Sequence, residues 1–570
     1  MESFLGEVAA DLYARYGEEL SQRAVLFPSR RARLFFTDAL ARIARRPMWQ
    51  PSWTTIDELM SEISGLRTGD RLRLITELYG IYSEYHAEPF DKFYFWGDML
   101  LADFDTIDKY RIDAAMLFRN IEEIREIEAD ISYLTPAQLR IVAFWSSLGA
   151  EADLSEEKRR FLAIWRTLGP VYRRFRERLS ELGIAYGGMV QRAAADRLRS
   201  GEFAFSTPRR FVVAGFNALS ECEKELFRFL SSAAETDFYW DYDSYYKDDP
   251  EQEAGMFVRE NVVRFPPRAE LSHDGMSRPK ELTSVAAVSN AVQCKYVATI
   301  LRGLAAGGRL GKETAVVLTD ENLLLPLLCA MPPEVGPVNV TMGYPLRASL
   351  AYTFVERLVE LQARRRTKGA DCTFYHADVT GLLAHPYVAG CDAELTRRLQ
   401  EEIMRERRIS VEASWLGRND LLRLVFSPAA DWRALSAWLS EVVAAVVRIP
   451  CPDDDARRRT EFLAVIAGEI ARLGNSLDEC GIEPAPEVYA SLLRRHLQTL
   501  RIPYEGEPLE GVQVMGILET RNLDFENVVI LSMNDDNFPG NRMAQASFIP
   551  YNLRAAYSLP TPEHHEGVYA

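Results

Sequence analysis

The sequence has few cysteines, and their spacing excludes the common cysteine-based sites. It contains seven, an odd number, with no pair at CxxC spacing. A zinc site or a disulfide framework is therefore not expected, and a reducing compartment fits best. No uninterrupted apolar run approaches the length of a membrane span. The first residues, MESFLGEVAADLYARYGEEL, lack the basic region of a signal peptide. We therefore expect a cytoplasmic protein with no membrane partner.

The chain also lacks an excess of positive charge. Its 67 basic and 83 acidic residues give a net charge of −16. This balance argues against a generally basic nucleic-acid coat, but not against a local basic groove along one phosphate path. The hydrophobic content of 47% and the aromatic content of 11% are typical of a well-packed globular protein. A chain of 570 residues predicts about three to four domains or subdomains.

Strand-like and helix-like patterns alternate in several parts of the chain. RAVLFPSRRARLFF predicts a short strand over 25–27, a turn at 28–29 and a helix from Arg30. Thr55 and Glu58 form a predicted capping box, and residues 70–200 are almost entirely helical in pattern. The pattern changes at Thr207–Pro208, after which RRFVVAGFNALSECEKELFRFL predicts strand, glycine turn and helix.

A second alternating region follows from about residue 281. LTSVAAVSNAVQCKYVATILRGL and ETAVVLTDENLLLPLLCAM each predict a strand followed by a helix, and residues 370–500 return to helices. GVQVMGILETRNLDFENVVILSMNDDNFP then predicts a strand, a charged hinge, a second strand and an acidic loop. Such alternation indicates parallel sheets with crossover helices.

The order of these segments resembles superfamily 1 helicases of the UvrD type, and most closely their AddB/RecC-like branch. VLFPSRRARLFFTDAL is similar to the strand, turn and helix that contact single-stranded DNA in active relatives. LLADFDTIDKYRIDAAMLF is similar to a pattern of the AddB/RecC-like branch, and VTGLLAHPYVAG resembles the LL-x-HP stretch of the second helical insert. The segment from Gly511 to Pro539 resembles the motif that active members write as HAAKGLEF…VF…GLEEG.FP, and these segments follow the family's order. VVAGFNALSECEKELFRFL stands where active helicases carry the Walker B sequence VDEFQD.

The resemblance implies an α/β fold with two RecA-like parallel-sheet domains, 1A and 2A, interrupted by helical inserts 1B and 2B. It also implies that a longer protein continues past residue 570 with an Arg-bearing motif and a PD-(D/E)xK nuclease domain. The predicted division of the chain is 1–69 (1A, first part), 70–206 (1B), 207–270 (1A, second part), 271–369 (2A, first part), 370–504 (2B) and 505–570 (2A, last part).

The residues that drive such a motor are missing from their expected positions. A motor of this class needs a glycine-rich turn with a lysine and a hydroxyl for phosphates and Mg²⁺. GGRLGKET, at 307–314, lacks the first glycine and carries Glu313 at the hydroxyl position, which predicts a surface turn. Against VDEFQD, the chain has Ala214 at the metal-binding Asp, Gly215 at the catalytic Glu and Ala218 at the last Asp. We expect no catalytic residues here, and neither ATP nor Mg²⁺ as cofactor.

Two segments are candidates for DNA contact. Arg30, Arg31 and Arg33 form a basic turn at a helix start, suited to phosphates. The alternative is a helix with solvated arginines. The resemblance places Thr520, Arg521 and Asn522 at a hinge between a DNA-contacting strand and the motor core. The alternative there is a solvated turn.

No metal site is expected. Asp103, Asp105 and Asp108 lack the glycine and glutamate of an EF-hand loop, and we expect them on an exposed helix face. His376 and His385 stand too far apart for one helical metal face. The dense aromatics of FDKFYFWGDM predict core packing rather than base stacking.

Together these features predict a catalytically inactive helicase-like scaffold for DNA end processing and recombinational repair. Its expected partners are DNA, as single strands or duplex ends, and an AddA/RecB-like helicase-nuclease. One alternative is a protein–protein scaffold that binds no DNA, which the charge of −16 favours. A further alternative is an active ATP-dependent helicase-nuclease subunit whose motor residues lie elsewhere in the chain.

Overall fold

The computed structural model shows a mixed α/β chain made of two compact units. It describes residues 3–118, 156–206, 209–269, 271–368, 371–449, 453–503, 509–540, 547–561 and 564. The first unit comprises Met1–Gly69, Met99–Met342 and Glu505–Ala570, and the second comprises Asp70–Asp98 and Gly343–Tyr504. Within these described ranges, no helix combines the length and apolar character of a membrane span.

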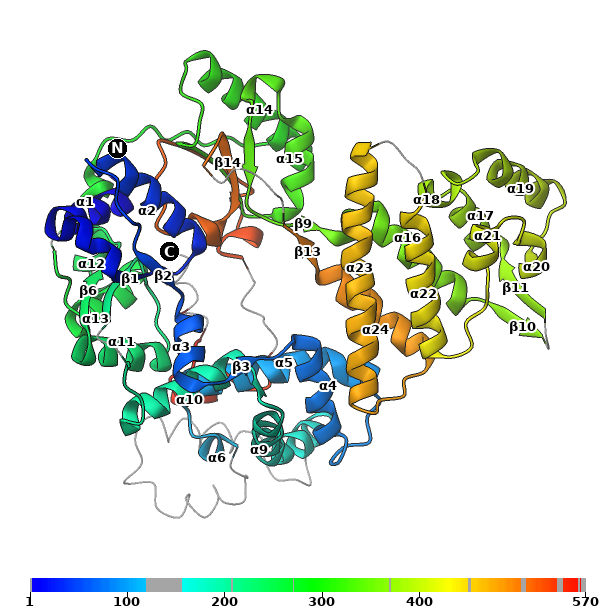
Figure 1. The fold of residues 1–570 in the computed structure, drawn as a ribbon, viewed down its shortest axis with the longest axis horizontal. Helices are drawn as coiled ribbons and strands as arrows, with labels where there is room; N and C mark the ends of the chain where they lie inside the picture. The colour runs from blue at the N-terminus through cyan, green and yellow to red at the C-terminus, as the bar shows by residue number, and fades with distance from the viewer. Residues whose placement is uncertain are drawn as a thin grey trace. The chain divides into compact units, whose positions relative to one another are not determined.

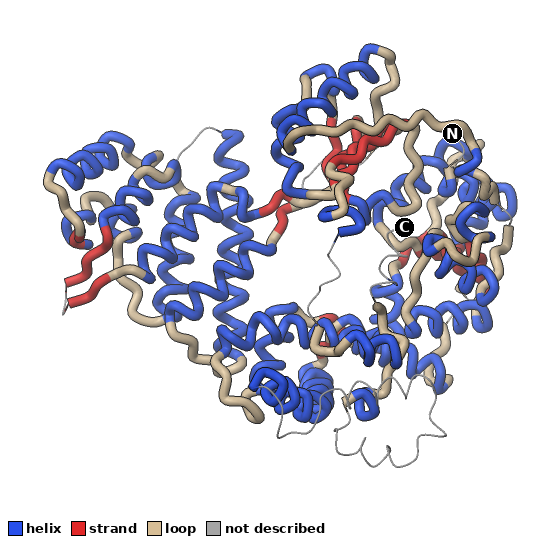
Figure 2. Tube along the Cα trace, turned by 180° about the vertical axis from the view of Figure 1, so that it is seen from behind, coloured by secondary structure: helices blue, strands red, loops and turns tan. Residues whose placement is uncertain are grey.

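The first unit contains a four-stranded parallel sheet, here the β5 sheet, in the order β2-β1-β5-β6 (Figures 1 and 2). Helix α2 begins after Ser29, whose hydroxyl accepts from the backbone N–H of Ala32. Apolar side chains of α1 and α2 pack with the strands into one buried cluster. The bounds are α1 Phe4–Tyr16, β1 Arg23–Leu26, α2 Arg30–Ile43, β2 Ser52–Thr54, β5 Arg210–Ala214, α11 Glu221–Ala233, β6 Glu235–Tyr239, α12 Ser244–Asp248 and α13 Met256–Arg264.

A second four-stranded parallel sheet of the first unit, here the β7 sheet, has the order β15-β7-β14-β8. Helices α14 and α15 bury their apolar residues against it, around Val316, Val514 and Leu531. The predicted hinge thus joins two strands that are separated by β7. The bounds are α14 Asn290–Ala306, β7 Thr314–Leu318, α15 Leu324–Ala330, β8 Val338–Val340, β14 Val512–Gly516, β15 Asn527–Leu531 and α25 Tyr551–Ala556.

The helical part of the first unit is centred on a buried carboxylate, Asp108. Tyr172 and Tyr186 each donate a hydrogen bond of 2.5 Å to it, and Arg192 Nη1 lies 3.1 Å away. Asp103 is buried as well. The expectation of an exposed aspartate face is therefore wrong for these two residues, because tyrosine and arginine donors from other helices satisfy Asp108. The bounds are α3 Ile56–Ser64, β3 Arg67–Thr68, α5 Phe90–Lys109, α6 Ala114–Leu117, α9 Glu156–Leu182, β4 Ile184–Ala185 and α10 Gly187–Ser200.

The second unit is mainly helical. The aromatics of α4 and the start of α5 pack together, as expected from FDKFYFWGDM: Phe93 is fully buried and its ring lies 4.5 Å from that of Trp96. A three-stranded antiparallel sheet, β10-β11-β12, was not predicted. The bounds are α4 Arg71–Tyr82, β9 Tyr344–Pro345, α16 Leu350–Ala363, β10 Arg366–Lys368, β11 Asp371–Tyr375, α17 His376–Leu383, α18 Pro386–Ala389, α19 Ala393–Arg405, β12 Ser410–Glu412, α20 Ala413–Leu416, α21 Asp420–Val425, α22 Trp432–Val447, α23 Asp453–Glu479, α24 Pro486–Thr499 and β13 Arg501–Ile502.

Most of the predicted local elements are present, including the capping box of Thr55 and Glu58 and the turn before β7. The strand predicted over 282–288 is wrong: this segment forms no ladder, and Leu282 and Val288 are 90% and 93% exposed. A strand needs a partner for its backbone groups, and none of the described strands provides one. The six-part division stays a prediction. Its changes at Thr207–Pro208, 270/271, 369/370 and 504/505 involve residues outside the described ranges.

Candidate nucleic-acid interface

The turns that follow β1, β5 and β6 lie together at one edge of the β5 sheet, because these parallel strands end at the same edge. In open α/β sheets this edge is the usual place for ligands. A loop from the β7 sheet, residues 517–525, reaches the same edge. Its Leu523 belongs to the apolar packing of both sheets, and its Phe525 ring meets the Phe35 ring of α2 edge to face at 6.1 Å. The edge is therefore already packed against protein.

Asn522 lies directly over Gly215, the residue that follows β5. Gly215 follows β5 with φ of +78°, a conformation that favours glycine. A Cβ atom on Gly215 would come within 2.5 Å of Asn522 Cγ and Nδ2. Asn522 itself has φ of +62°, which asparagine tolerates better than most residues. The space that a side chain at position 215 would need is thus filled by the Asn522 amide.

Two carboxylates stand beside this amide. Asn522 Nδ2 donates to Asp241 Oδ2 at 3.1 Å, and Asp524 accepts from the backbone N–H of Phe4 at 2.9 Å. Water reaches the Asp241 side chain, but surrounding protein atoms crowd it. This desolvation raises the pKa of Asp241 to about 6, against the opposing effect of Asn522 and with a further increase from Asp524. Burial also raises the pKa of Asp524. Once ionised, this pair would repel a phosphate group.

The predicted contact residues of the 517–525 loop differ in how they are used. The Thr520 hydroxyl donates to the Ile517 carbonyl at 2.7 Å. Asn522 is used as described above. Arg521 is exposed.

The three arginines at the start of α2 differ in their exposure to solvent. Arg30 and Arg33 are exposed, and the Arg33 guanidinium lies 5.3 Å from the Trp53 ring centre, a cation–π distance. Arg31 is half-buried close to Glu519, and burial lowers its pKa although Glu519 opposes the shift. Arg31 therefore faces the 517–525 loop, while Arg30 and Arg33 face solvent.

The other two positions compared with VDEFQD in the sequence are alanines. Ala214 is fully buried at the end of β5, and Ala218 is exposed in the turn before α11. Across the described ranges, no group of three or more His, Cys, Asp or Glu side chains is placed to hold a metal ion. The arrangement suits a fixed contact between the two sheets.

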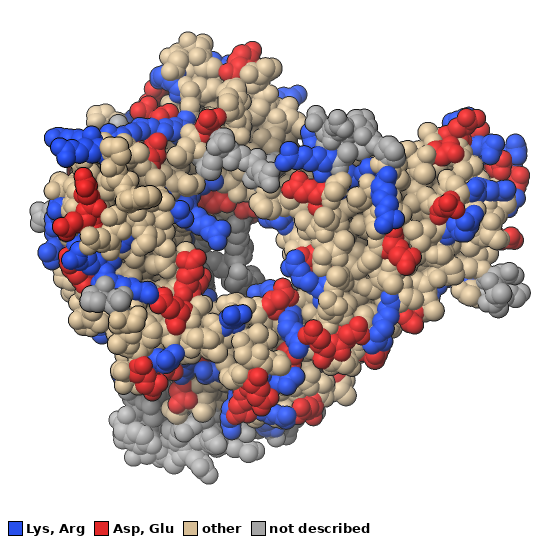
Figure 3. Space-filling model, viewed as in Figure 1, with Lys and Arg blue, Asp and Glu red and all other residues tan. Residues whose placement is uncertain are grey.

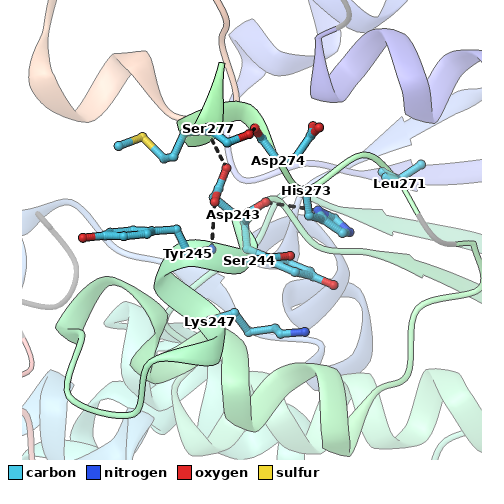
Figure 4. A pocket seen from close by; sticks show the side chains of 10 residues that line it. Asp243, Ser244, Tyr245, Lys247, Leu271, His273, Asp274 and Ser277 are labelled. Carbon is cyan, nitrogen blue, oxygen red and sulfur yellow. Dashed lines mark hydrogen bonds between the residues drawn. The ribbon is translucent and has the colours of Figure 1, made fainter. Parts of the chain in front are cut away.

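An open pocket of about 730 Å³ lies beyond β6, near this edge (Figure 4). Its polar groups are largely used within the chain: Asp243 accepts from the backbone N–H groups of Tyr245 at 2.8 Å and Met276 at 2.7 Å. The rings of Tyr242 and His273 stack at 3.7 Å, and burial lowers the pKa of His273, which favours its neutral form. These contacts hold residues 271–277 against the start of α12.

The contact between Gly215 and Asn522 joins positions 307 apart in sequence, and the sequence interpretation did not predict it. The available signal was a glycine directly after a buried strand. Comparison with known proteins adds no family assignment. A scan against protein-family models finds no match, and a search of curated proteins finds no significant relative.

Proposed function

We propose that this chain is a helicase-like scaffold that holds DNA for end processing and recombinational repair, without hydrolysing ATP. The observation that carries the proposal is the Asn522 amide over Gly215. In a working motor this edge must admit a nucleotide and offer carboxylates to Mg²⁺ and water. Here it is packed with the 517–525 loop, and residues 214, 215 and 218 carry no carboxylate.

The finer fold, two RecA-like domains each interrupted by a helical insert, belongs to the same proposal. It is supported by two separate four-stranded parallel sheets in the first unit and by the helical segments between their strands. Such a scaffold would guide a strand toward a partner motor of AddA/RecB type and toward a nuclease domain in a longer protein. Arg30, Arg33 and Arg521 are the accessible cations offered to phosphates.

The test is binding of the chain to labelled single-stranded and tailed duplex DNA. Removing one phosphate contact should reduce the salt slope by about 0.7 on a single strand. We expect Arg30→Ala, Arg33→Ala and Arg521→Ala each to flatten the slope. Arg397→Ala, which removes an exposed arginine in the second unit, should leave it unchanged. Equal slopes for all variants would contradict this contact assignment. The absence of DNA binding would instead favour a protein–protein scaffold.

A further inference from the structure

A short loop after α2 presents an exposed tryptophan close in sequence to several exposed arginines. Trp49 is 85% exposed, and of the tryptophans in the described part it is the only exposed one. Residues 39–56 contain Arg42, Arg45 and Arg46 but no acidic residue, within a chain of net charge −16. A single exposed aromatic needs no explanation. Its position in a locally basic stretch of an acidic protein does.

The loop is held in place rather than dangling. The backbone N–H of Arg45 donates to the Tyr13 hydroxyl of α1 at 3.0 Å. Met48 packs against the apolar cluster of the β5 sheet, and Ser52 begins β2 and donates to the Arg23 carbonyl at 3.1 Å. Trp49 therefore projects from a backbone anchored on both sides, so little conformational entropy would be lost on stacking.

Two of the three arginines near Trp49 in the sequence are exposed and make no ion pair with a described residue. These two are Arg45 and Arg46, while Arg42 pairs with Asp38 at 3.1 Å. The loop returns from the end of α2 to β2, where Trp53 lies under Arg33. Exposed arginines thus lie at both ends of α2, with the Trp49 loop running between them. Figure 3 shows basic and acidic side chains interspersed over one face of the molecule.

We propose that Trp49, Arg45 and Arg46 form a binding site for single-stranded nucleic acid. A base would stack on the Trp49 indole, and flanking phosphates would contact the two guanidinium groups, the combination by which proteins hold single strands without reading sequence. The site would extend the path of Arg30 and Arg33 along α2. An anionic membrane surface also attracts arginine and tryptophan. Interfacial binding, however, normally uses the long apolar face of an amphipathic helix, which this loop lacks. The inference rests on the proposed function.

The experiment measures binding of the full chain to a fluorescein-labelled oligothymidine across a salt series. Trp49→Ala should weaken binding about five- to 150-fold, the range for loss of one stacked base, and leave the salt slope unchanged. Trp49→Phe should retain most of the affinity. The pair Arg45→Ala/Arg46→Ala should flatten the slope by about 1.4, from two single-strand contacts. The charge-matched pair Arg397→Ala/Arg423→Ala, on exposed helices of the second unit, should behave as the unaltered chain.

The failures are distinguishable. If the unaltered chain shows no salt-dependent binding to oligothymidine, the proposed function itself fails. If it binds while Trp49→Ala and the Arg45/Arg46 pair match it, only the Trp49 site is overturned. Binding of anionic phosphatidylserine vesicles that depends on Trp49, without an effect on oligothymidine, would overturn the nucleic-acid assignment in favour of a membrane surface.

Discussion

Replacing Gly215 by alanine should open the contact between the β5 sheet and the 517–525 loop. Two costs add at this position. An alanine at φ of +78° has the left-handed backbone strain of an L-residue, about 1–2 kcal/mol. Its Cβ would also stand 2.5 Å from the Asn522 amide, and relieving such overpacking typically costs about 1–3 kcal/mol. The expected total is about 2–5 kcal/mol in the free energy of local opening.

Gly201 provides a matched control. It has φ of +74°, and a Cβ atom there would meet nothing within 4 Å. Gly201→Ala should therefore show the strain alone, about 1–2 kcal/mol. Removing the Asn522 side chain as well, in Gly215→Ala/Asn522→Gly, should relieve the overlap and bring the cost of Gly215→Ala down to that of the control.

Hydrogen–deuterium exchange is the suitable assay, because a chain with two units does not give one global unfolding free energy. In Gly215→Ala, faster exchange should appear in both 212–220 and 517–525. In Gly201→Ala, it should stay at the end of α10. The reasoning is refuted if the two alanine variants cost the same, or if 517–525 exchanges at its original rate in Gly215→Ala.

Three further predictions concern buried or crowded ionisable groups. Asp241 has a raised pKa, so its charge opposes folding once the pH rises through about 6. Asp241→Asn should therefore raise the free energy of local opening at pH 7 by about 1 kcal/mol after solvent screening, seen as slower exchange. At pH 4 the same substitution should bring no gain. Burial lowers the pKa of His385 to about 4, so the local stability around His385 should fall as the pH drops from about 6.5 to 4. A His385→Gln chain should lose less over that range, measured by hydrogen–deuterium exchange in α17 and α18 after correction for the intrinsic pH dependence of exchange. Asp108→Ala leaves two tyrosines and two arginines without their acceptor, and should cost about 3–5 kcal/mol in the free energy of local opening, measured by exchange in α5, α9 and α10. Asp196→Ala, at an exposed carboxylate, should cost under about 1 kcal/mol. Similar costs for the two variants would contradict the buried network.

The local elements of the fold were predictable because their signals are local. The capping box at Thr55 and the strand-glycine-helix pattern around Gly215 depend on residues a few positions apart. The strand over 282–288 was predicted wrongly, since an apolar, β-branched run does not reveal whether a neighbouring strand will pair with it. The burial of Asp108 was missed for a similar reason: its donors come from helices 64 or more residues away.

The candidate site was predictable in its parts but not in its geometry. The missing carboxylates at 214, 215 and 218 can be seen in the sequence. The Asn522 amide over Gly215, and the inward orientation of Arg31, depend on how two sheets distant in sequence meet. Trp49 gave no motif signal, because the exposure of a single side chain depends on the tertiary packing around it.

The most direct test of a DNA-holding chain without its own motor is one titration of single-stranded DNA over about 50–200 mM salt, with and without Mg-ATP, while phosphate release is recorded. We expect log-linear loss of binding with salt, the same affinity in both series, and no DNA-stimulated phosphate release. DNA-stimulated hydrolysis of ATP would contradict an inactive motor, and binding that is absent or insensitive to salt would contradict a DNA-holding scaffold.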